Sequence, residues 1–316
     1  NLNSMKKLFL LFCVCWISIL SGCQPKENNP PDGSILTPRQ QIDSLFRNQY
    51  KQDLFQGEVV ITQNGETLYE NYLGLADRSW CIPFDKDVKL DIASLNKSMI
   101  AALALKAVEE ELLNLEDKLV DLLSVFSYEG HFHSEITLHD LLSHSSGLAD
   151  YDGVEEEFQK DNYLQFKRSR FTNKEYVNFI SNIEPVGKPG MQFYYSNFAY
   201  HLVAIIIAKT YEKPFATVLE EKLTIPLGLN NTVSEGKNEI VMPKLAQAYN
   251  YQEVTGQWLE NPFIDLSLSR RIFSTASDMN RWAQVMDNPG WLSENSLTLM
   301  KQNHLNSPKK FHDFLH

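Results

Sequence analysis

Ile92-Ala93-Ser94-Leu95-Asn96-Lys97 is the most informative stretch of this 316-residue sequence. From Ser94 to Leu113 apolar residues recur at helical spacing, and no Pro or Gly interrupts them. We therefore predict a long helix that begins at Ser94. Because residues i and i+3 share a helix face, the ammonium of Lys97 can reach the hydroxyl of Ser94. A serine hydroxyl becomes a nucleophile when a neighbouring base takes its proton.

The rest of the chain mixes strand and helix patterns. Thr37-Pro38 opens an amphipathic helix, and Asn64-Gly65 separates two β-rich segments, which predicts a hairpin. A hairpin, a helix-rich middle and little βαβ alternation predict an α+β fold with an antiparallel sheet rather than a doubly wound fold. Further helices are predicted over 115–123, 137–142, 173–180, 200–210, 215–223 and 296–300.

The overall composition describes a globular protein with a mild acidic excess. Hydrophobic residues make up 43% of the chain, which is enough for a substantial core. Lys and Arg number 29 against 40 Asp and Glu, giving a formal net charge of -11. This balance argues against nucleic acid or an acidic lipid surface as the main partner. We expect a monomer.

The first residues carry the pattern of a secretion signal. Lys6 and Lys7 precede an apolar run, Leu8–Leu20, that is too short to span a membrane as a helix. Ser21-Gly22-Cys23 follows and resembles the bacterial lipobox, whose cysteine is lipidated. We predict a lipoprotein signal peptide over 1–22, lipid attachment at Cys23, a polar tether over 23–37 and a globular domain over 38–316. The alternative is an ordinary signal peptide in which Cys23 is incidental.

This leader implies a location. We expect the protein in the bacterial cell envelope, held at the membrane by its lipid anchor. Cys81 would then be the only thiol of the globular part, and we expect it to serve packing rather than chemistry.

Tyr195-Ser196-Asn197 is a second candidate element. It follows a turn at Gly187–Gly190 and precedes an apolar helix, so Tyr195 is expected on a loop. A phenol and a lysine beside one serine can move its proton, and an Asn amide can bind a carbonyl and an N–H together. Because S-x-x-K and Y-x-N each recur elsewhere in the chain, an ordinary helix cap and a half-buried aromatic residue remain alternatives.

Taken together, five ordered blocks resemble the serine β-lactamase and penicillin-binding-protein superfamily. The closest branch contains class C β-lactamases, D-aminopeptidases and related esterases. The blocks are Ile92–Lys97, Leu141–Leu148, Pro189–Asn197, Pro226–Leu229 with Thr232, and Ser274–Met279 with Trp282.

The resemblance implies a β-lactamase and transpeptidase-like α+β fold, an antiparallel sheet flanked by helices plus a helical lobe. It also implies a serine hydrolase that works through an acyl-enzyme on an ester, a D-amino-acid peptide or amide, or a β-lactam. Ser94 would be the nucleophile, Lys97 and Tyr195 would exchange its proton, and Asn197 would contact the acyl side of the substrate. The backbone N–H of Ser94 and one from a strand would form the oxyanion hole. The substrate would be a small molecule or peptidoglycan-like, and no metal or other cofactor is implied.

The sequence departs from the superfamily at two places. Arg270-Arg271 stands where small residues or glycine are usual, so these arginines either line the cleft and favour an acidic substrate group or are solvated. The third motif, His-x-Gly or Lys-Thr-Gly, does not follow Trp282. We therefore expect a chain truncated at its C-terminus, lacking the final sheet strands and poorly active.

Three other interpretations were weighed. His131, His133, His139 and His144 lie close together, but the Asp-His pair of metallo-hydrolases does not follow, so no metal is predicted. An α/β-hydrolase elbow around Ser145 lacks its first glycine. The alternative from another class is a non-catalytic or degenerate lipoprotein that binds peptidoglycan fragments.

Overall fold

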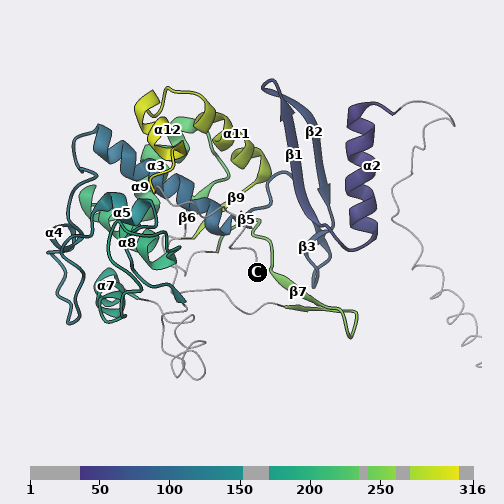
Figure 1. Cartoon of the computed structure of the whole chain (residues 1–316). Coiled ribbons are helices and arrows are strands. Elements are labelled where there is room, and N and C mark those ends of the chain that lie inside the picture. The colour runs from purple at the N-terminus through teal and green to yellow at the C-terminus, as the bar shows by residue number, and fades with distance from the viewer. Residues whose placement is uncertain (1–35, 152–170, 235–240, 261–270, 306–316) are drawn as a thin grey trace, which may run out of the picture. The chain divides into compact units, whose positions relative to one another are not determined.

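A computed structural model describes residues 36–151, 171–234, 241–260 and 271–305 (Figure 1). The chain divides into two compact units, 1–44 and 45–316. The predicted signal peptide, Cys23 and most of the tether lie outside the described residues, whereas the predicted first helix is present as α2 (Pro38–Lys51). Among the described residues, no helix has both the length and the apolar character needed to cross a membrane.

The predicted hairpin is present as β1 (Gly57–Gln63) and β2 (Glu66–Leu73), which pair antiparallel. Asn64 and Gly65 connect them with φ angles of 54° and 81°, the left-handed conformations that a tight hairpin turn requires. Helix α11 (Ala276–Asp287) packs against β1. The Asn-Gly signal therefore predicted this element correctly.

The remaining strands form small antiparallel sheets. In the described ranges each ladder has two or three strands, with the order β5-β9-β6 in the sheet next to Ser94. A polar hairpin, β7 with β8, was not predicted. These strands are β3 (Leu75–Asp77), β4 (Ile82–Pro83), β5 (Leu90–Asp91), β6 (Val233–Ser234), β7 (Tyr249–Gln252), β8 (Gln257–Glu260) and β9 (Ile272–Ser274).

The core of the helical part is built on two helices. α3 (Asn96–Glu109) packs against α8 (Asn197–Thr210) (Figure 1), and Ala102 and Ala104 of α3 are both fully buried. The helices around them are α4 (Leu119–Leu122), α5 (Leu138–Leu142), α7 (Asn173–Ser181), α9 (Phe215–Leu219), η4 (Glu220–Thr224), α10 (Ile225–Leu227) and α12 (Glu294–Lys301).

Local hydrogen bonds set where these helices begin. Thr137 and Asp140 form a capping box at α5, and the Ser196 hydroxyl accepts the N–H of Ala199, so α8 begins at Asn197 rather than at the predicted Tyr200. The predicted helix over 115–123 is shorter, because the N–H of Leu119 donates to the carbonyl of Ile136 instead of to that of Leu115, and α4 begins only at Leu119.

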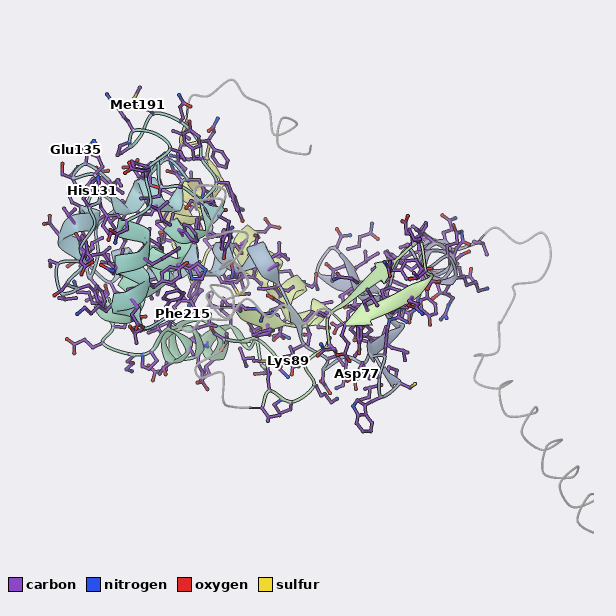
Figure 2. All side chains as sticks on the ribbon, turned by 90° about the horizontal axis from the view of Figure 1, so that it is seen from below. Asp77, Lys89, His131, Glu135, Met191 and Phe215 are labelled. Carbon is purple, nitrogen blue, oxygen red and sulfur yellow. The ribbon has the colours of Figure 1, made fainter. Side chains whose placement is uncertain are left out.

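Cys81 was predicted wrongly. The thiol is exposed, on the connection between β3 and β4, and its residue has a φ angle of 54°. The connection projects its side chains outward, and the neighbouring Trp80 is 80% exposed. In the helical part, by contrast, the side chain of Phe215 is buried and that of Met191 is exposed. Figure 2 labels both residues.

Candidate active site

The turn that presents Ser94 is held in a restricted conformation. Ser94 lies in a single 3-10 turn, η1 (Ala93–Leu95), that runs directly into α3. Ala93, the residue before it, has a φ angle of 44°, a left-handed value that costs a residue with a Cβ about 1–2 kcal/mol. The Asp91 carboxylate stabilises this turn by accepting the N–H of Ala93 at 2.9 Å. The hydroxyl is thus exposed at the start of a long helix, as the sequence predicted.

Lys97 and Tyr195 both reach the Ser94 hydroxyl. The Lys97 ammonium lies 3.3 Å from Ser94 Oγ, and the Tyr195 hydroxyl lies 2.6 Å from the same atom. Lys97 Nζ is also 4.9 Å from the centroid of the Tyr195 ring. The structure therefore brings together the three residues predicted to be catalytic, two of them 101 positions apart. This geometry can carry a proton away from the serine, while the catalytic roles themselves stay a prediction.

Asn197 is bound by protein groups on both sides of its amide. Its Oδ1 accepts from Lys97 Nζ at 2.8 Å, and its Nδ2 donates to Asp150 Oδ2 at 2.8 Å. The backbone N–H of Asn197 donates to Asp150 Oδ1 at 3.0 Å. Each end of the amide keeps one more hydrogen-bonding position, a second Nδ2 hydrogen and a second Oδ1 lone pair, for the predicted contact with substrate. Sequence reasoning missed Asp150, whose only signal is its place just after the Leu141–Leu148 block.

His144 supports the loop that carries Tyr195. The two rings stack with centroids 4.6 Å apart, and His144 Nδ1 accepts the N–H of Ser196 at 3.2 Å. Burial, and secondly the charge of Lys97, lower the pKa of His144 to about 4. The imidazole is therefore neutral at neutral pH and adds no positive charge beside Lys97. The sequence does not predict this role, because Ser196, next to Tyr195, lies 52 positions from His144.

The position of Arg271 contradicts the interpretation that this arginine is solvated. Its Nε and Nη2 atoms donate to Asp91 Oδ2 at 2.8 and 2.6 Å, and its side chain is only 16% exposed. Arg271 is therefore not solvated, because it fixes the carboxylate that holds the turn before Ser94. Arg270 lies outside the described residues.

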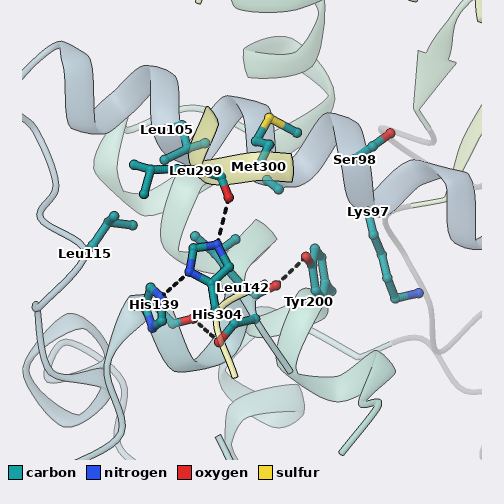
Figure 3. A pocket seen from close by; sticks show the side chains of 12 residues that line it. Lys97, Ser98, Leu105, Leu115, His139, Leu142, Tyr200, Leu299, Met300 and His304 are labelled. Atoms are coloured by element: carbon teal, nitrogen blue, oxygen red, sulfur yellow. Dashed lines mark hydrogen bonds between the residues drawn. The ribbon is translucent and has the colours of Figure 1, made fainter. Parts of the chain in front are cut away.

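A cavity of about 210 Å³ lies beside α3, and Lys97 and Tyr200 are among its lining residues. His139 and His304 meet in it with Nε2 and Nδ1 2.9 Å apart (Figure 3). Figure 3 shows Tyr200 between this histidine pair and Lys97. His131, one of the clustered histidines, is instead exposed (Figure 2).

The described residues contain no group of three or more His, Cys, Asp or Glu side chains that could hold a metal ion. The four histidines of the sequence cluster also do not converge on one point. His133 Nδ1 accepts the N–H of Glu135, and His139 pairs with His304.

Comparison with known families agrees with this geometry. Residues 42–312 match the family model described as Beta-lactamase. The chain belongs to the beta-lactamase family. Among curated relatives, Penicillin-binding protein 4* of Bacillus subtilis is 29% identical over 196 residues, 61% of this chain and 41% of that protein. Protein flp of Staphylococcus aureus is 25% identical over 274 residues, 85% of this chain and 52% of that protein. The chain thus spans about half the length of these relatives.

Solved structures agree on the fold. The octameric penicillin-binding protein homologue from Pyrococcus abyssi superposes on this protein with a TM-score of 0.70 at 23% identity. The superposition covers 85% of the present chain and 61% of the Pyrococcus chain. Other structures with this fold, at TM-scores of 0.58 to 0.64, include a hydrolase with promiscuous acyltransferase activity, a D-stereospecific amidohydrolase and a class C beta-lactamase. The protein therefore has the predicted β-lactamase and transpeptidase-like α+β fold. The solved structures with this fold include several kinds of hydrolase.

Proposed function

We propose that the protein is a serine hydrolase that forms an acyl-enzyme on Ser94. The observation that carries the proposal is the position of Ser94 Oγ, 2.6 Å from the Tyr195 hydroxyl and 3.3 Å from Lys97 Nζ. A nucleophile within hydrogen-bonding reach of its base, with that base held by a third group, is the arrangement that covalent catalysis needs. Asn197 is that third group for Lys97.

In the acylation step, Ser94 Oγ attacks the carbonyl carbon of the substrate. Its proton passes to the Tyr195 and Lys97 pair, and the carbonyl oxygen takes the negative charge of the tetrahedral intermediate. When the bond to the leaving group breaks, the leaving group receives that proton. A water molecule then attacks the carbonyl carbon of the acyl ester and gives a proton to the same pair. The bond from that carbon to Ser94 Oγ breaks, the pair passes the proton to Ser94 Oγ, and the acid product leaves, so the enzyme is restored.

The substrate is an ester, a D-amino-acid peptide or amide, or a β-lactam, since all three form the same kind of acyl-enzyme. Two exposed apolar side chains flank the nucleophile: Leu95 is 60% exposed and Tyr195 is 39% exposed. These surfaces suit the apolar part of an acyl group. We also propose that Cys23 carries lipid and holds the protein at the bacterial cell envelope, on the strength of the leader sequence.

The direct test is covalent labelling. The whole protein is treated with an electrophilic phosphonate, and peptides are analysed by mass spectrometry, with Ser94→Ala as the matched control. We expect one adduct, on Ser94, that the control lacks. Absence of this adduct would refute the hydrolase and favour a protein that only binds peptidoglycan fragments. A panel of esters, D-amino-acid amides and β-lactams then ranks the substrate classes by acylation rate.

A further inference from the structure

Asp150 ends a chain of hydrogen bonds that begins at the nucleophile. Its carboxylate receives two N–H groups of Asn197, the backbone one at 3.0 Å and the side-chain one at 2.8 Å. The other end of the Asn197 amide receives Lys97 Nζ at 2.8 Å, and Lys97 lies 3.3 Å from Ser94 Oγ. One continuous chain therefore joins Asp150 to Ser94.

Donor and acceptor chemistry fixes the orientation of the central amide. Lys97 Nζ donates to Asn197, so the atom of Asn197 that faces Lys97 is the oxygen. A carboxylate can only accept, so the atom that faces Asp150 must be the nitrogen. If Asp150 were an amide, the Asn197 side chain could rotate by 180°. Its NH₂ group would then face Lys97, where it would oppose the N–H donors of an ammonium or occupy the lone pair with which an amine takes the Ser94 proton, and Lys97 would lose this support.

The backbone contact makes the arrangement more rigid. Asn197 is the first residue of α8, and the same carboxylate that binds its side chain also binds its backbone N–H. A negative charge at the start of a helix is favoured by the helix dipole. Asp150 is thus held on the helix end while it holds the amide, and the amide cannot rotate without breaking charge-assisted bonds.

We propose that Asp150 is a positioning residue, which locks the Asn197 amide and thereby keeps the Lys97 amine at Ser94. This inference rests on the proposed function, since it assigns Asp150 a part in the proton transfer from Ser94. Asp150 acts through Asn197. Its effect on rate must therefore disappear when the Asn197 side chain is removed.

A double-mutant cycle on the whole protein tests this dependence. The rate of phosphonate labelling at Ser94 is measured for the parent, Asp150→Asn, Asn197→Ala and the double variant. We expect Asp150→Asn to slow labelling roughly 10- to 100-fold, the scale on which misplaced catalytic groups act. The double variant should label within about twofold of Asn197→Ala, because the two residues form one pathway. Rate losses that multiply would overturn the proposal.

A variant in which the two side chains are exchanged tests whether the slower labelling of Asp150→Asn comes only from loss of folding. In Asp150→Asn with Asn197→Asp, the new carboxylate accepts from Lys97, and the new amide donates to it while accepting the backbone N–H of residue 197. Labelling should recover at least fivefold over Asp150→Asn alone, roughly 1 kcal/mol of barrier. No recovery would contradict the proposal. Asp53→Asn, in the exposed turn after α2, makes the same chemical change and should leave the rate unchanged.

A second readout does not depend on acylation. Hydrogen exchange of the Asn197 side-chain amide, followed by NMR, should be slow in the parent and at least tenfold faster in Asp150→Asn. Equal exchange in the two proteins would overturn the positioning role even if Ser94 proved unreactive. A parent that shows slow amide exchange without any Ser94 adduct would instead refute the proposed function alone.

Discussion

Glu58 makes stability depend on pH in the neutral range. Its Oε2 accepts the N–H of Ala276 at the start of α11 at 2.7 Å, while its Oε1 is buried with no partner among the described residues. Burial, assisted by the negative charges of Asp85, Asp87 and Glu70, raises the pKa of Glu58 from 4.5 to about 7 against the opposing bond from Ala276. The folded protein therefore binds a proton at Glu58 that the unfolded chain has already lost.

The size of this effect follows from the change in pKa. One pKa unit corresponds to about 1.4 kcal/mol, so a rise from 4.5 to about 7 would correspond to roughly 3 kcal/mol for a group fully removed from water. Glu58 is only half-buried, and solvent screens part of the penalty, so we expect about 1–2 kcal/mol. This stability is present below pH 4.5 and is lost as the pH rises through about 7.

Thermal unfolding of the parent and of Glu58→Gln, measured from pH 5 to pH 8.5, tests this. The amide copies the shape of the protonated acid and keeps an acceptor for Ala276. At pH 8.5 the variant should melt roughly 2–4 °C above the parent, and at pH 5 the difference should be close to zero. Glu66 is an exposed carboxylate on the paired strand, so Glu66→Gln should melt at the same temperature as the parent at both pH values. A parent and variant that keep the same difference at every pH would refute the reasoning.

Three further predictions concern other parts of the molecule. Burial raises the pKa of Glu109, but bonds from Ser296 and Ser293 at the start of α12 outweigh it and lower the pKa to about 2. Glu109→Gln should therefore lower the free energy of unfolding, measured with urea, by about 1 kcal/mol at pH 7 and by less as the pH falls below about 4. An equal loss at every pH would contradict this. Arg271→Gln should slow Ser94 labelling severalfold, because it removes the partner of Asp91. Lys301→Gln, at an exposed ion pair, should not change the rate. Equal rates in the parent and both variants would show that the turn before Ser94 does not need Arg271. Cys23→Ser should move the protein from the membrane fraction to the soluble fraction, and unchanged membrane recovery would exclude lipid anchoring through this residue.

The sequence predicted best what depends on near neighbours. The approach of Lys97 to Ser94 follows from their spacing on one helix, and the β1–β2 hairpin follows from Asn64-Gly65. The position of Tyr195 beside Ser94 could not be worked out from local pattern, since 101 residues separate them. It was available only because the family resemblance already implied the complete fold.

What the sequence could not supply was the set of supports around the site. Asp150 binds a residue 47 positions away, and Arg271 binds Asp91 across 180 positions, so neither pair leaves a periodic signal. The β7–β8 hairpin was missed for a different reason. Its strands are only four residues long and largely exposed, and its turn lacks an Asn-Gly pair, so the signal for it is weak.

One backbone carbonyl sets the direction of the hydrogen bond in the histidine pair of the cavity beside α3. His304 Nε2 lies 2.7 Å from the carbonyl oxygen of Leu299, which can only accept, so this nitrogen always carries hydrogen. The bond between His304 Nδ1 and His139 Nε2 needs one hydrogen between them. Because His304 Nε2 holds the hydrogen of the neutral ring, His304 Nδ1 accepts and His139 Nε2 donates. The Leu299 carbonyl thus selects the tautomers of two histidines, and through them it links the residues that follow α12 to α5.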